Sequence, residues 1–367
     1  MTLEAARIER VVLHRIRIPF RSPFVTGHGT ETHKHATIVE VLAEGVTGWG
    51  ECAALENPTY TYEYADGAFF VLRDLLAPQL IDQRPALVVG HPMAKAAIEA
   101  AILDVHLRMT SLSLAAYLGV TRSMVPAGVA VGIADGPDEL VEAVAVRVAE
   151  GYRRVKLKIG PGRDIEWVAA VRAAFPALEL HVDANGAYSL ATAPTLQRLD
   201  ALGLALIEQP FDIDDLEGHA ALAAMIETPI CLDESITSAR ACERALDMGA
   251  CSVVNLKQAR VGGLAEALRI HSICRQRGIG LWCGGMLETG VGRALNLALA
   301  AMPGFALTGD ISATSRYFTR DITAPTELVD GYLAVPTGPG IGVEVDREFL
   351  ATCTIGTATI VPSGRPG

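Results

Sequence analysis

Five ionisable residues recur at nearly constant spacing through the middle of the chain. Lys158, Asp183, Glu208, Asp233 and Lys257 follow one another at intervals of 25, 25, 25 and 24 residues, and each lies at the end of an apolar run, just before a loop. In a parallel barrel the carboxyl ends of the strands converge on one mouth, where barrel active sites lie. Charges at such positions are costly unless they are paired or bind a metal. The spacing therefore predicts two amines and three carboxylates in one site.

The three carboxylates are a candidate metal site. Asp183, Glu208 and Asp233 have no His or Cys ligand beside them, and a set of carboxylate oxygens suits Mg²⁺ better than zinc, with Mn²⁺ able to substitute. Asn185, two residues beyond Asp183, and Glu234, next to Asp233, are expected to orient these ligands. The alternative for any single acid is a solvated helix cap. Five ionisable residues at the same position of five consecutive βα units make that alternative weak for the whole set.

Two lysines alternate on one predicted strand. Lys156 and Lys158 flank Leu157, so both amines would project into the barrel while Leu157 faces the surrounding helices. Neighbouring positive charge and desolvation lower the pKa of an amine, which makes it a useful general base near neutral pH. Lys257 would lie across the barrel mouth from Lys158. A substrate carbon held between these two lysines could exchange a proton on either face.

The elements that must position these residues begin at Val125, where the chain changes to short β-rich runs separated by amphipathic helical stretches. This alternation is typical of βα units around a parallel sheet. Eight such runs fit the number that a closed barrel needs. They lie at residues 125–131, 154–159, 178–182, 205–207, 230–232, 252–256, 280–283 and 305–307.

The segment before the barrel has the pattern of a smaller α+β domain. Apolar alternation at residues 8–18 and 36–46 predicts an antiparallel sheet with a loop at 19–30, and helical periodicity follows at 63–80 and 93–108. After residue 323, prolines and glycines predict a tail that returns to the first domain, with an irregular end over 357–367. The predicted fold class is α/β: a (β/α) barrel, or modified TIM barrel, over 123–323, with a capping domain of residues 1–122 completed by 324–367.

Composition limits the class of partner. The chain has 367 residues and a formal net charge of −11, which argues against nucleic acid because nucleic acid needs a basic face. No apolar run approaches the roughly 20 residues of a membrane span. Seven scattered cysteines without a Cys-x-x-Cys pair are expected to be buried free thiols. We expect a cytoplasmic homo-oligomer that acts on a small molecule and binds neither nucleic acid nor membrane.

Several segments resemble the enolase superfamily, and within it the muconate-lactonizing-enzyme subgroup, which carries Lys-x-Lys on the second barrel strand and one Lys on the sixth. Their wording is similar to the o-succinylbenzoate synthase and N-succinylamino acid racemase subfamily over nearly the whole chain: KLKIGPG, DANGAY, LIEQPF, CLDES, NLKQARVGG, WCGGMLETG and PTGPGIGV. Enzymes of this superfamily use a Lys or His base with Mg²⁺. The resemblance implies that Asp183, Glu208 and Asp233 bind the metal.

The resemblance also implies roles for the lysines. Lys158 and Lys257 would be the acid/base pair, and Lys156 would stabilise the negative charge of an enediolate formed by removing a proton beside a carboxylate. Two reactions are implied: dehydration to o-succinylbenzoate, a step of menaquinone biosynthesis, and racemisation of an N-succinylamino acid. In the first Lys158 would move the proton while Lys257 stabilises; in the second both lysines would exchange protons. Both substrates are small carboxylates with a succinyl arm.

Residues that set specificity are less distinct in the sequence. Gly284 and Gly285 follow the seventh run and could offer backbone N–H groups to an anionic arm. Arg260, three residues after Lys257, could tune the pKa of that lysine or pair with a helix carboxylate. The loop at 19–30 and the segment at 51–62 are expected to act as lids over the barrel mouth. The alternative for the glycines and the two segments is that they are plain turns.

Other functions stay open at this point. A dipeptide epimerase also uses a lysine on each face but needs a carboxylate to bind the free amino group, where WCGGMLETG has Gly284 and Gly285 at the strand end. A cycloisomerase or a sugar-acid dehydratase would use the same metal triad. A Schiff-base aldolase needs one lysine and leaves three carboxylates unexplained. Outside enzymes, an anion-binding barrel remains as an alternative, although binding alone does not require amines on both faces of a metal.

Overall fold

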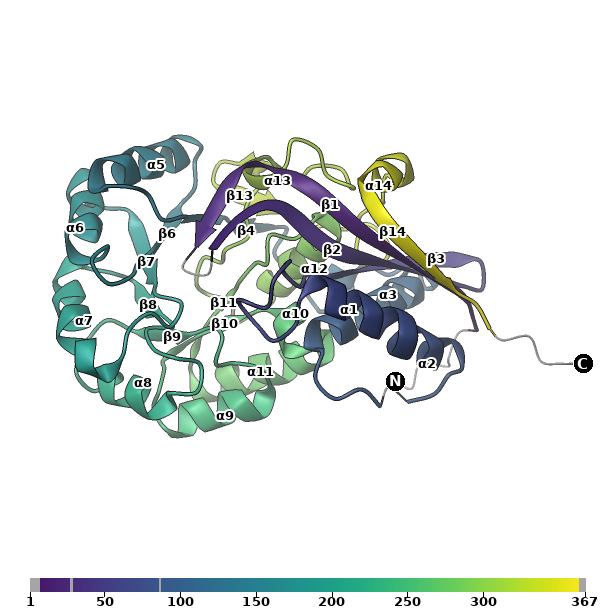
Figure 1. The fold of residues 1–367 in the computed structure, drawn as a ribbon, viewed down its shortest axis with the longest axis horizontal. Helices are drawn as coiled ribbons and strands as arrows, with labels where there is room; N and C mark the ends of the chain where they lie inside the picture. The colour runs from purple at the N-terminus through teal and green to yellow at the C-terminus, as the bar shows by residue number, and fades with distance from the viewer. Residues whose placement is uncertain (1–6, 27–28, 86, 363–367) are drawn as a thin grey trace, which may run out of the picture.

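The computed structural model describes residues 7–26, 29–85 and 87–362, and it contains a parallel barrel sheet beside an antiparallel capping sheet (Figure 1). The predicted fold class, a modified barrel with an N-terminal α+β capping domain, is confirmed. Among the described residues no helix is both long enough and apolar enough to cross a membrane. All seven cysteines are buried free thiols, as expected.

The barrel sheet has seven hydrogen-bonded strands in sequential order. They are β5 (Gly128–Val131), β6 (Arg154–Lys158), β7 (Glu179–Asp183), β8 (Leu206–Glu208), β9 (Ile230–Leu232), β10 (Val253–Leu256) and β11 (Gly280–Cys283). Six of the predicted runs agree with these strands to within one residue. Apolar residues such as Val155, Val182 and Leu232 are fully buried between the sheet and the helices, which is the packing that drives a barrel to form.

Helices cover the outside of this sheet, as the teal and green ribbons of Figure 1 show. They are α5 (Pro137–Ala149), α6 (Ile165–Ala174), α7 (Ala193–Leu199), α8 (Leu216–Ala223), α9 (Ala239–Asp247), α10 (Gln258–Val261), α11 (Leu264–Arg277) and α12 (Gly290–Ala300). Two short 3₁₀ turns, η2 (Leu190–Thr192) and η3 (Asp200–Leu202), flank α7.

The first and last predicted barrel runs need correction. The run at 125–131 is divided, because the N–H of Ala127 donates to Gly331 O and β4 (Met124–Pro126) instead joins β13 (Tyr332–Ala334) and β12 (Leu328–Val329). The run at 305–307 is not a strand: it makes one bridge from Phe305 to β11. The guanidinium of Arg154 donates from Nε and Nη2 to Thr308 O, at 3.2 and 2.8 Å. These bonds satisfy the carbonyl in place of the N–H of a neighbouring strand.

The capping sheet has the order β14-β1-β2-β3. Its strands are β1 (Ile8–Thr26), β2 (Gly29–Ala43), β3 (Val46–Cys52) and β14 (Thr354–Ile360), and its helices are α1 (Ala65–Val71), the π-helical turn η1 (Leu72–Leu76), α2 (Ala77–Ile81), α3 (Pro92–Met109) and α4 (Leu114–Tyr117). Helix α3 packs closely on β3 because Gly48 and Gly50 lack side chains: a Cβ there would lie 2.3 Å from Ala101 O and 2.0 Å from Ala97 O. Two further helices, α13 (Thr314–Tyr317) and α14 (Arg347–Cys353), precede β14.

Two predictions about the capping domain were wrong. Residues 19–26 and 29–30 are not a loop but the far parts of β1 and β2, and the two prolines of this stretch are accommodated by a register shift between Pro19 and Phe24. Gly27 lies outside the described residues. The end of the chain is not irregular up to residue 360, because β14 pairs with β1 from Val11 to Ile16. Residues 363–367 lie outside the described part.

Buried polar contacts hold the capping sheet to the barrel. Glu51, at the end of β3, accepts hydrogen bonds from the N–H and hydroxyl of Thr289 and from the N–H of Gly292, so it caps the N-terminus of α12. Lys34 of β2 is fully buried and donates to Met286 O at 3.0 Å. These contacts fix the segment after β11 against the capping sheet.

Candidate active site

The regular spacing of the charged residues becomes spatial adjacency at the strand ends. The ladder places Lys158 opposite Asp183 and Asp183 opposite Glu208, so three of the predicted residues lie side by side on β6, β7 and β8. Asp233 and Lys257 follow the ends of β9 and β10 directly. All five lie at the carboxyl edge of the sheet, where barrel active sites are built.

The two lysines of β6 both face the barrel interior, as their alternation predicted. Leu157 between them is fully buried on the other side of the strand. Lys156 is nearly inaccessible and its Nζ lies 2.9 Å from Asp183 Oδ2, 2.7 Å from Glu208 Oε2 and 2.5 Å from Asp310 Oδ2. Lys156 is therefore surrounded by three carboxylates, which keep a buried ammonium charged.

Lys158 reaches further toward the mouth and begins a chain of polar contacts. Its Nζ donates to Asp183 Oδ2 at 2.7 Å and to Asn185 Oδ1 at 2.6 Å. Asn185, whose backbone φ of 44° lies in the left-handed region that Asn tolerates, donates from Nδ2 to Glu234 Oε1 at 2.8 Å. Asn185 and Glu234, the pair predicted to orient the metal ligands, thus lie beside Lys158, and the N–H of Asn185 donates to Asp183 Oδ1 at 3.1 Å.

Lys257 is held from both the barrel and the capping domain. Its Nζ donates to Asp233 Oδ2 at 2.8 Å and to the hydroxyl of Tyr60 at 2.9 Å. Arg260 is fully buried and pairs with Asp233 Oδ1, and it also donates to the Tyr60 hydroxyl at 3.0 Å. The partner of Arg260 is therefore the strand-end carboxylate Asp233 rather than a carboxylate on a helix, and Arg260 is not part of the pocket wall.

These contacts set the protonation of the site. Burial is the largest single effect on Lys257 and lowers its pKa, but Asp233 and Tyr60 together outweigh burial and raise the pKa above the ordinary value; Arg260 acts in the opposite direction. Burial also lowers the pKa of Lys156. The negative charges of Asp183, Asp310 and Glu208 together outweigh burial, so the pKa of Lys156 is raised. The expectation that neighbouring positive charge and burial lower the pKa of Lys156 was wrong, because its ammonium lies against carboxylates.

The carboxylates carry the complementary effect. Burial and the charge of Asp183 raise the pKa of Glu208 to about 8, and burial with the charges of Asp233 and Asp183 raises the pKa of Glu234 to about 7. Asp233 is buried as well, but Lys257 and Arg260 lower its pKa. Acid groups at this end of the site therefore repel one another despite the nearby amines.

A divalent cation is the ligand that relieves this repulsion, and the donor set fits one. Asp183, Glu208 and Asp233 supply only carboxylate oxygens, and buried Glu234 Oε2 has no hydrogen-bond partner among the described residues. In the present arrangement lysine and arginine side chains occupy these oxygens, and no group of three His, Cys, Asp or Glu side chains in the described ranges is close enough to hold a metal. Binding would require the carboxylates to exchange ammonium partners for the metal.

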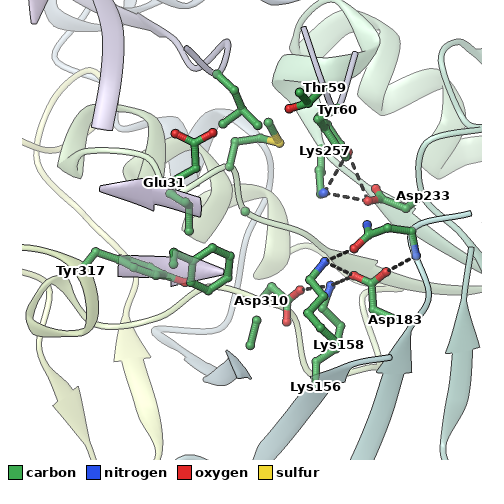
Figure 2. Close-up of a pocket in the computed structure, with 17 residues that line it drawn as sticks. Glu31, Thr59, Tyr60, Lys156, Lys158, Asp183, Asp233, Lys257, Asp310 and Tyr317 are labelled. Atoms are coloured by element: carbon green, nitrogen blue, oxygen red, sulfur yellow. Dashed lines mark hydrogen bonds and ion pairs between the residues drawn. The ribbon is translucent and has the colours of Figure 1, made fainter. Parts of the chain in front are cut away.

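The charged groups line one pocket (Figure 2). Its barrel side includes Lys156, Lys158, Asp183, Asp233 and Lys257, and its remaining wall is formed by Phe24, Glu31, Leu55, Thr59, Tyr60, Ala130, Asn185, Gly285, Met286, Leu287, Asp310 and Tyr317. Glu208 does not line the pocket; it is fully buried and contacts Lys156. The two segments predicted to act as lids contribute Phe24, Leu55, Thr59 and Tyr60 to the wall.

The two glycines after β11 behave differently from each other. The N–H of Gly284 donates to Leu256 O at 3.2 Å, so the expectation that Gly284 offers its N–H to a substrate was wrong. A Cβ at Gly284 would lie 2.2 Å from Asn255 Oδ1 and 2.5 Å from Lys257 Cε; this glycine makes room for Lys257. Gly285 does line the pocket.

Three polar residues of the site were missed in the sequence. Asp310 pairs with both Lys156 and Arg154; its signal was an acid three residues after the predicted run at 305–307. Asn255 donates to Glu208 Oε1 at 2.7 Å, and its signal was alternation with Lys257 around Leu256. Tyr60 carried no periodic signal, because it reaches the site from the capping domain.

The fold and site define the class of protein. Residues 139–349 match the family described as enolase C-terminal domain-like, and residues 8–119 match the N-terminal domain of the mandelate racemase and muconate lactonizing enzymes. The chain belongs to the mandelate racemase/muconate lactonizing enzyme family of the enolase superfamily.

Individual proteins of the family are similar to the chain over nearly its whole length. The chain is 48% identical to an N-succinylamino acid racemase from Amycolatopsis, over 95% of this chain and 98% of the relative, and 44% identical to an o-succinylbenzoate synthase from Geobacillus kaustophilus, over 95% and 96%. A solved structure of an enolase superfamily member from Listeria innocua superimposes with a TM-score of 0.93 at 41% identity, covering 97% of this chain and 99% of that one.

Proposed function

We propose that this chain is a Mg²⁺-dependent enzyme that removes a proton α to a carboxylate, as an o-succinylbenzoate synthase, an N-succinylamino acid racemase, or both. The observation that carries the proposal is a single pocket that receives Lys158 from β6 and Lys257 from the position directly after β10, each beside a strand-end carboxylate. The two named relatives, at 48% and 44% identity over nearly their full lengths, support the same reaction class.

The metal would be held by Asp183, Glu208 and Asp233, with Asn185 and Glu234 orienting this ligand set; Mn²⁺ could replace Mg²⁺. When bound, the metal supplies Lewis-acid stabilisation of the negative charge that develops on the substrate carboxylate. Without such stabilisation the enediolate anion is high in free energy, and for this reason the α-proton is very weakly acidic.

The proton itself is moved by the lysines. Lys158 and Lys257 serve as the acid/base pair, and the buried ammonium of Lys156 stabilises the enediolate electrostatically. Since Asp233 raises the pKa of Lys257, this amine would accept the α-proton as a base more readily when a further cation, in addition to Arg260, engages Asp233. The same carboxylate then favours the ammonium product of the transfer.

Two reactions follow from this arrangement. In racemisation, one neutral lysine takes the α-proton of an N-succinylamino acid, and the ammonium of the other lysine returns a proton to the opposite face. In dehydration, Lys158 takes the α-proton and returns it to the leaving hydroxyl, so that water departs, while Lys257 remains a cation beside the enediolate. The N–H of Gly285, which lies in the pocket wall, is proposed to contact the anionic succinyl arm.

The remaining features of the proposal concern the whole molecule. We propose a division into a capping domain of residues 1–122 with 324–367 and a catalytic domain of residues 123–323, because β14 pairs with β1 in one sheet. A homo-oligomer working in the cytoplasm is expected. Light scattering after gel filtration would measure the oligomeric state.

Deuterium exchange tests the reaction class. We expect the wild-type protein with Mg²⁺ to exchange the α-proton of N-succinyl-L-phenylalanine in D₂O and to racemise it, and to lose both activities in EDTA. A parallel assay for o-succinylbenzoate formation apportions the two reactions. Absence of both exchange and dehydration with metal bound would contradict the assignment. Exchange with dipeptides but not with N-succinylamino acids would favour a dipeptide epimerase instead.

A further inference from the structure

One carboxylate lies in the pocket wall away from the strand ends. Glu31 is on β2, in the capping domain, and lines the same pocket as Lys158 and Lys257. Figure 2 shows it across the pocket from Asp183, beyond the side chains that make the ion pairs of the floor. It is half-buried. The reaction proposed above gives no role to this charge.

The charge of Glu31 has no ion-pair partner in the described part of the chain. Among the residues that the structure describes, no cation lies within ion-pair distance of Glu31, whereas Asp183 and Asp233 each have two. The nearby cation Lys34 is turned elsewhere: its Nζ donates to Met286 O and lies 3.6 Å from Glu51 Oε1. Burial and the negative charge of Glu56 raise the pKa of Glu31, and Lys34 opposes this only in part. A bound cation would therefore be favoured here.

The wall that leads to Glu31 is apolar. Phe24, Leu55, Met286 and Leu287 line it together with Tyr317. An apolar wall with one carboxylate suits a hydrocarbon chain that ends in an ammonium or guanidinium group, because the chain is desolvated along the wall while its charged end is paired.

Charge also decides which part of a substrate can lie there. The reacting carbon and its carboxylate belong between Lys158 and Lys257. A succinyl arm ends in a second carboxylate, which Glu31 would repel. The group that remains to approach Glu31 is the side chain of the amino acid.

We propose that Glu31 is a specificity-determining residue that contacts the amino-acid side chain and makes the enzyme prefer N-acylated amino acids with basic side chains. The inference rests on the racemase activity proposed above and names its substrate class. The paired charge would raise kcat/KM for a basic side chain about tenfold over a neutral one of equal length, since a charge-assisted hydrogen bond contributes about 1.5 kcal/mol or more.

The test compares two substrates that differ only in the terminal group. Nα-succinyl-L-lysine and N-succinyl-L-norleucine share the hydrocarbon chain, and the ratio of their kcat/KM values for deuterium exchange isolates the contribution of the ammonium. Wild type should give a ratio of about ten, Glu31→Gln a ratio near one, and Glu31→Lys a preference for N-succinyl-L-glutamate over the lysine derivative. Turnover of norleucine by each variant reports that it is folded.

Glu56→Gln is the matched control. It removes the same charge from an acid that is more than half exposed and does not line the pocket, so the lysine preference should stay. The proposed contact between Glu31 and the substrate side chain is overturned if Glu31→Gln leaves the lysine-to-norleucine ratio of kcat/KM unchanged. It is also overturned if Glu56→Gln lowers that ratio equally. Exchange of norleucine without any lysine preference in wild type overturns the role of Glu31 alone, whereas no exchange with any N-succinylamino acid overturns the racemase activity and this inference together.

Discussion

The hydroxyl of Tyr60 accepts a hydrogen bond from Lys257 Nζ at 2.9 Å, although the two residues are 197 positions apart in the chain. The same hydroxyl donates to Asp233 Oδ2 at 3.1 Å. One side chain of the capping domain thus positions both a proposed base and a proposed metal ligand of the barrel.

Replacing Tyr60 by Phe should therefore affect one face of the substrate. Tyr60 contacts Lys257 but not Lys158, so deuterium exchange should slow about tenfold for one enantiomer of N-succinylphenylalanine, the loss expected for one hydrogen bond, and much less for the other. Tyr62→Phe is the control, because the Tyr62 side chain is 90% exposed. Equal slowing of both enantiomers would show that Tyr60 acts on the pocket as a whole.

Asp310→Asn should destabilise the protein. The substitution leaves Arg154 and Lys156 buried without the anion that they share, and removing one partner of a buried pair costs about 3–5 kcal/mol of unfolding free energy. Asp247→Asn removes an acid from the exposed pair with Arg277 and should cost less than about 1 kcal/mol. Urea denaturation of both variants measures the difference; similar values for the two would contradict a structural role for Asp310.

Gly284→Ala should impair catalysis through Lys257. The added Cβ would meet Asn255 Oδ1 and Lys257 Cε, and a displacement of about 1 Å in a catalytic group can cost on the order of a hundredfold in rate. Gly136→Ala places its Cβ in open space and should keep the wild-type kcat. Measurement of kcat for both variants tests this, and a Gly284→Ala enzyme with normal kcat would mean that the segment shifts without moving Lys257.

The environment of His219 should make the folded protein less stable in acid. Its Nε2 accepts a hydrogen bond from the N–H of Phe211, and its Nδ1 lies 2.6 Å from Asp215 O, so the neutral ring is the form that fits. Burial lowers its pKa below 6.5. Above pH 6.5 the ring is neutral in both states and contributes nothing; as pH falls below 6.5 the unfolded chain binds more protons, so the unfolding free energy falls until the lowered pKa is passed.

His219→Gln removes this titration. Urea unfolding of both proteins from pH 7 to pH 5 should show a steeper loss for wild type than for the variant. Parallel curves would mean that the ring titrates normally in the folded protein.

The strand ends were the predictable part of the molecule. A hydrophobic run followed by an ionisable residue repeats with each βα unit, so Lys158, Asp183, Glu208, Asp233 and Lys257 could be assigned to one edge of a sheet before their contacts were known. The same local rule failed at the eighth position, where Arg154 satisfies the backbone carbonyl of Thr308 from a distant strand.

Contacts between domains were not predictable from periodicity. Tyr60 and Glu31 enter the pocket from the capping domain, and their positions depend on how β2 and the segment after β3 pack over the barrel. The pKa of Lys156 was misjudged for a related reason. The sequence indicates that amines and carboxylates share the barrel mouth, but it does not show that Lys156 Nζ lies 2.7 Å from Glu208 Oε2 and 2.9 Å from Asp183 Oδ2. The domain boundaries after residues 122 and 323 stay predictions.

The most direct test of a two-base site is deuterium exchange by Lys158→Ala and Lys257→Ala, each measured with both enantiomers of N-succinylphenylalanine in the presence of Mg²⁺. Both variants should lose racemisation. Each should still exchange the α-proton of one enantiomer, and the two variants should retain opposite enantiomers, because the remaining lysine reaches only one face. Racemisation by either variant, or retention of the same enantiomer by both, would contradict the assignment of Lys158 and Lys257 to opposite faces of the substrate.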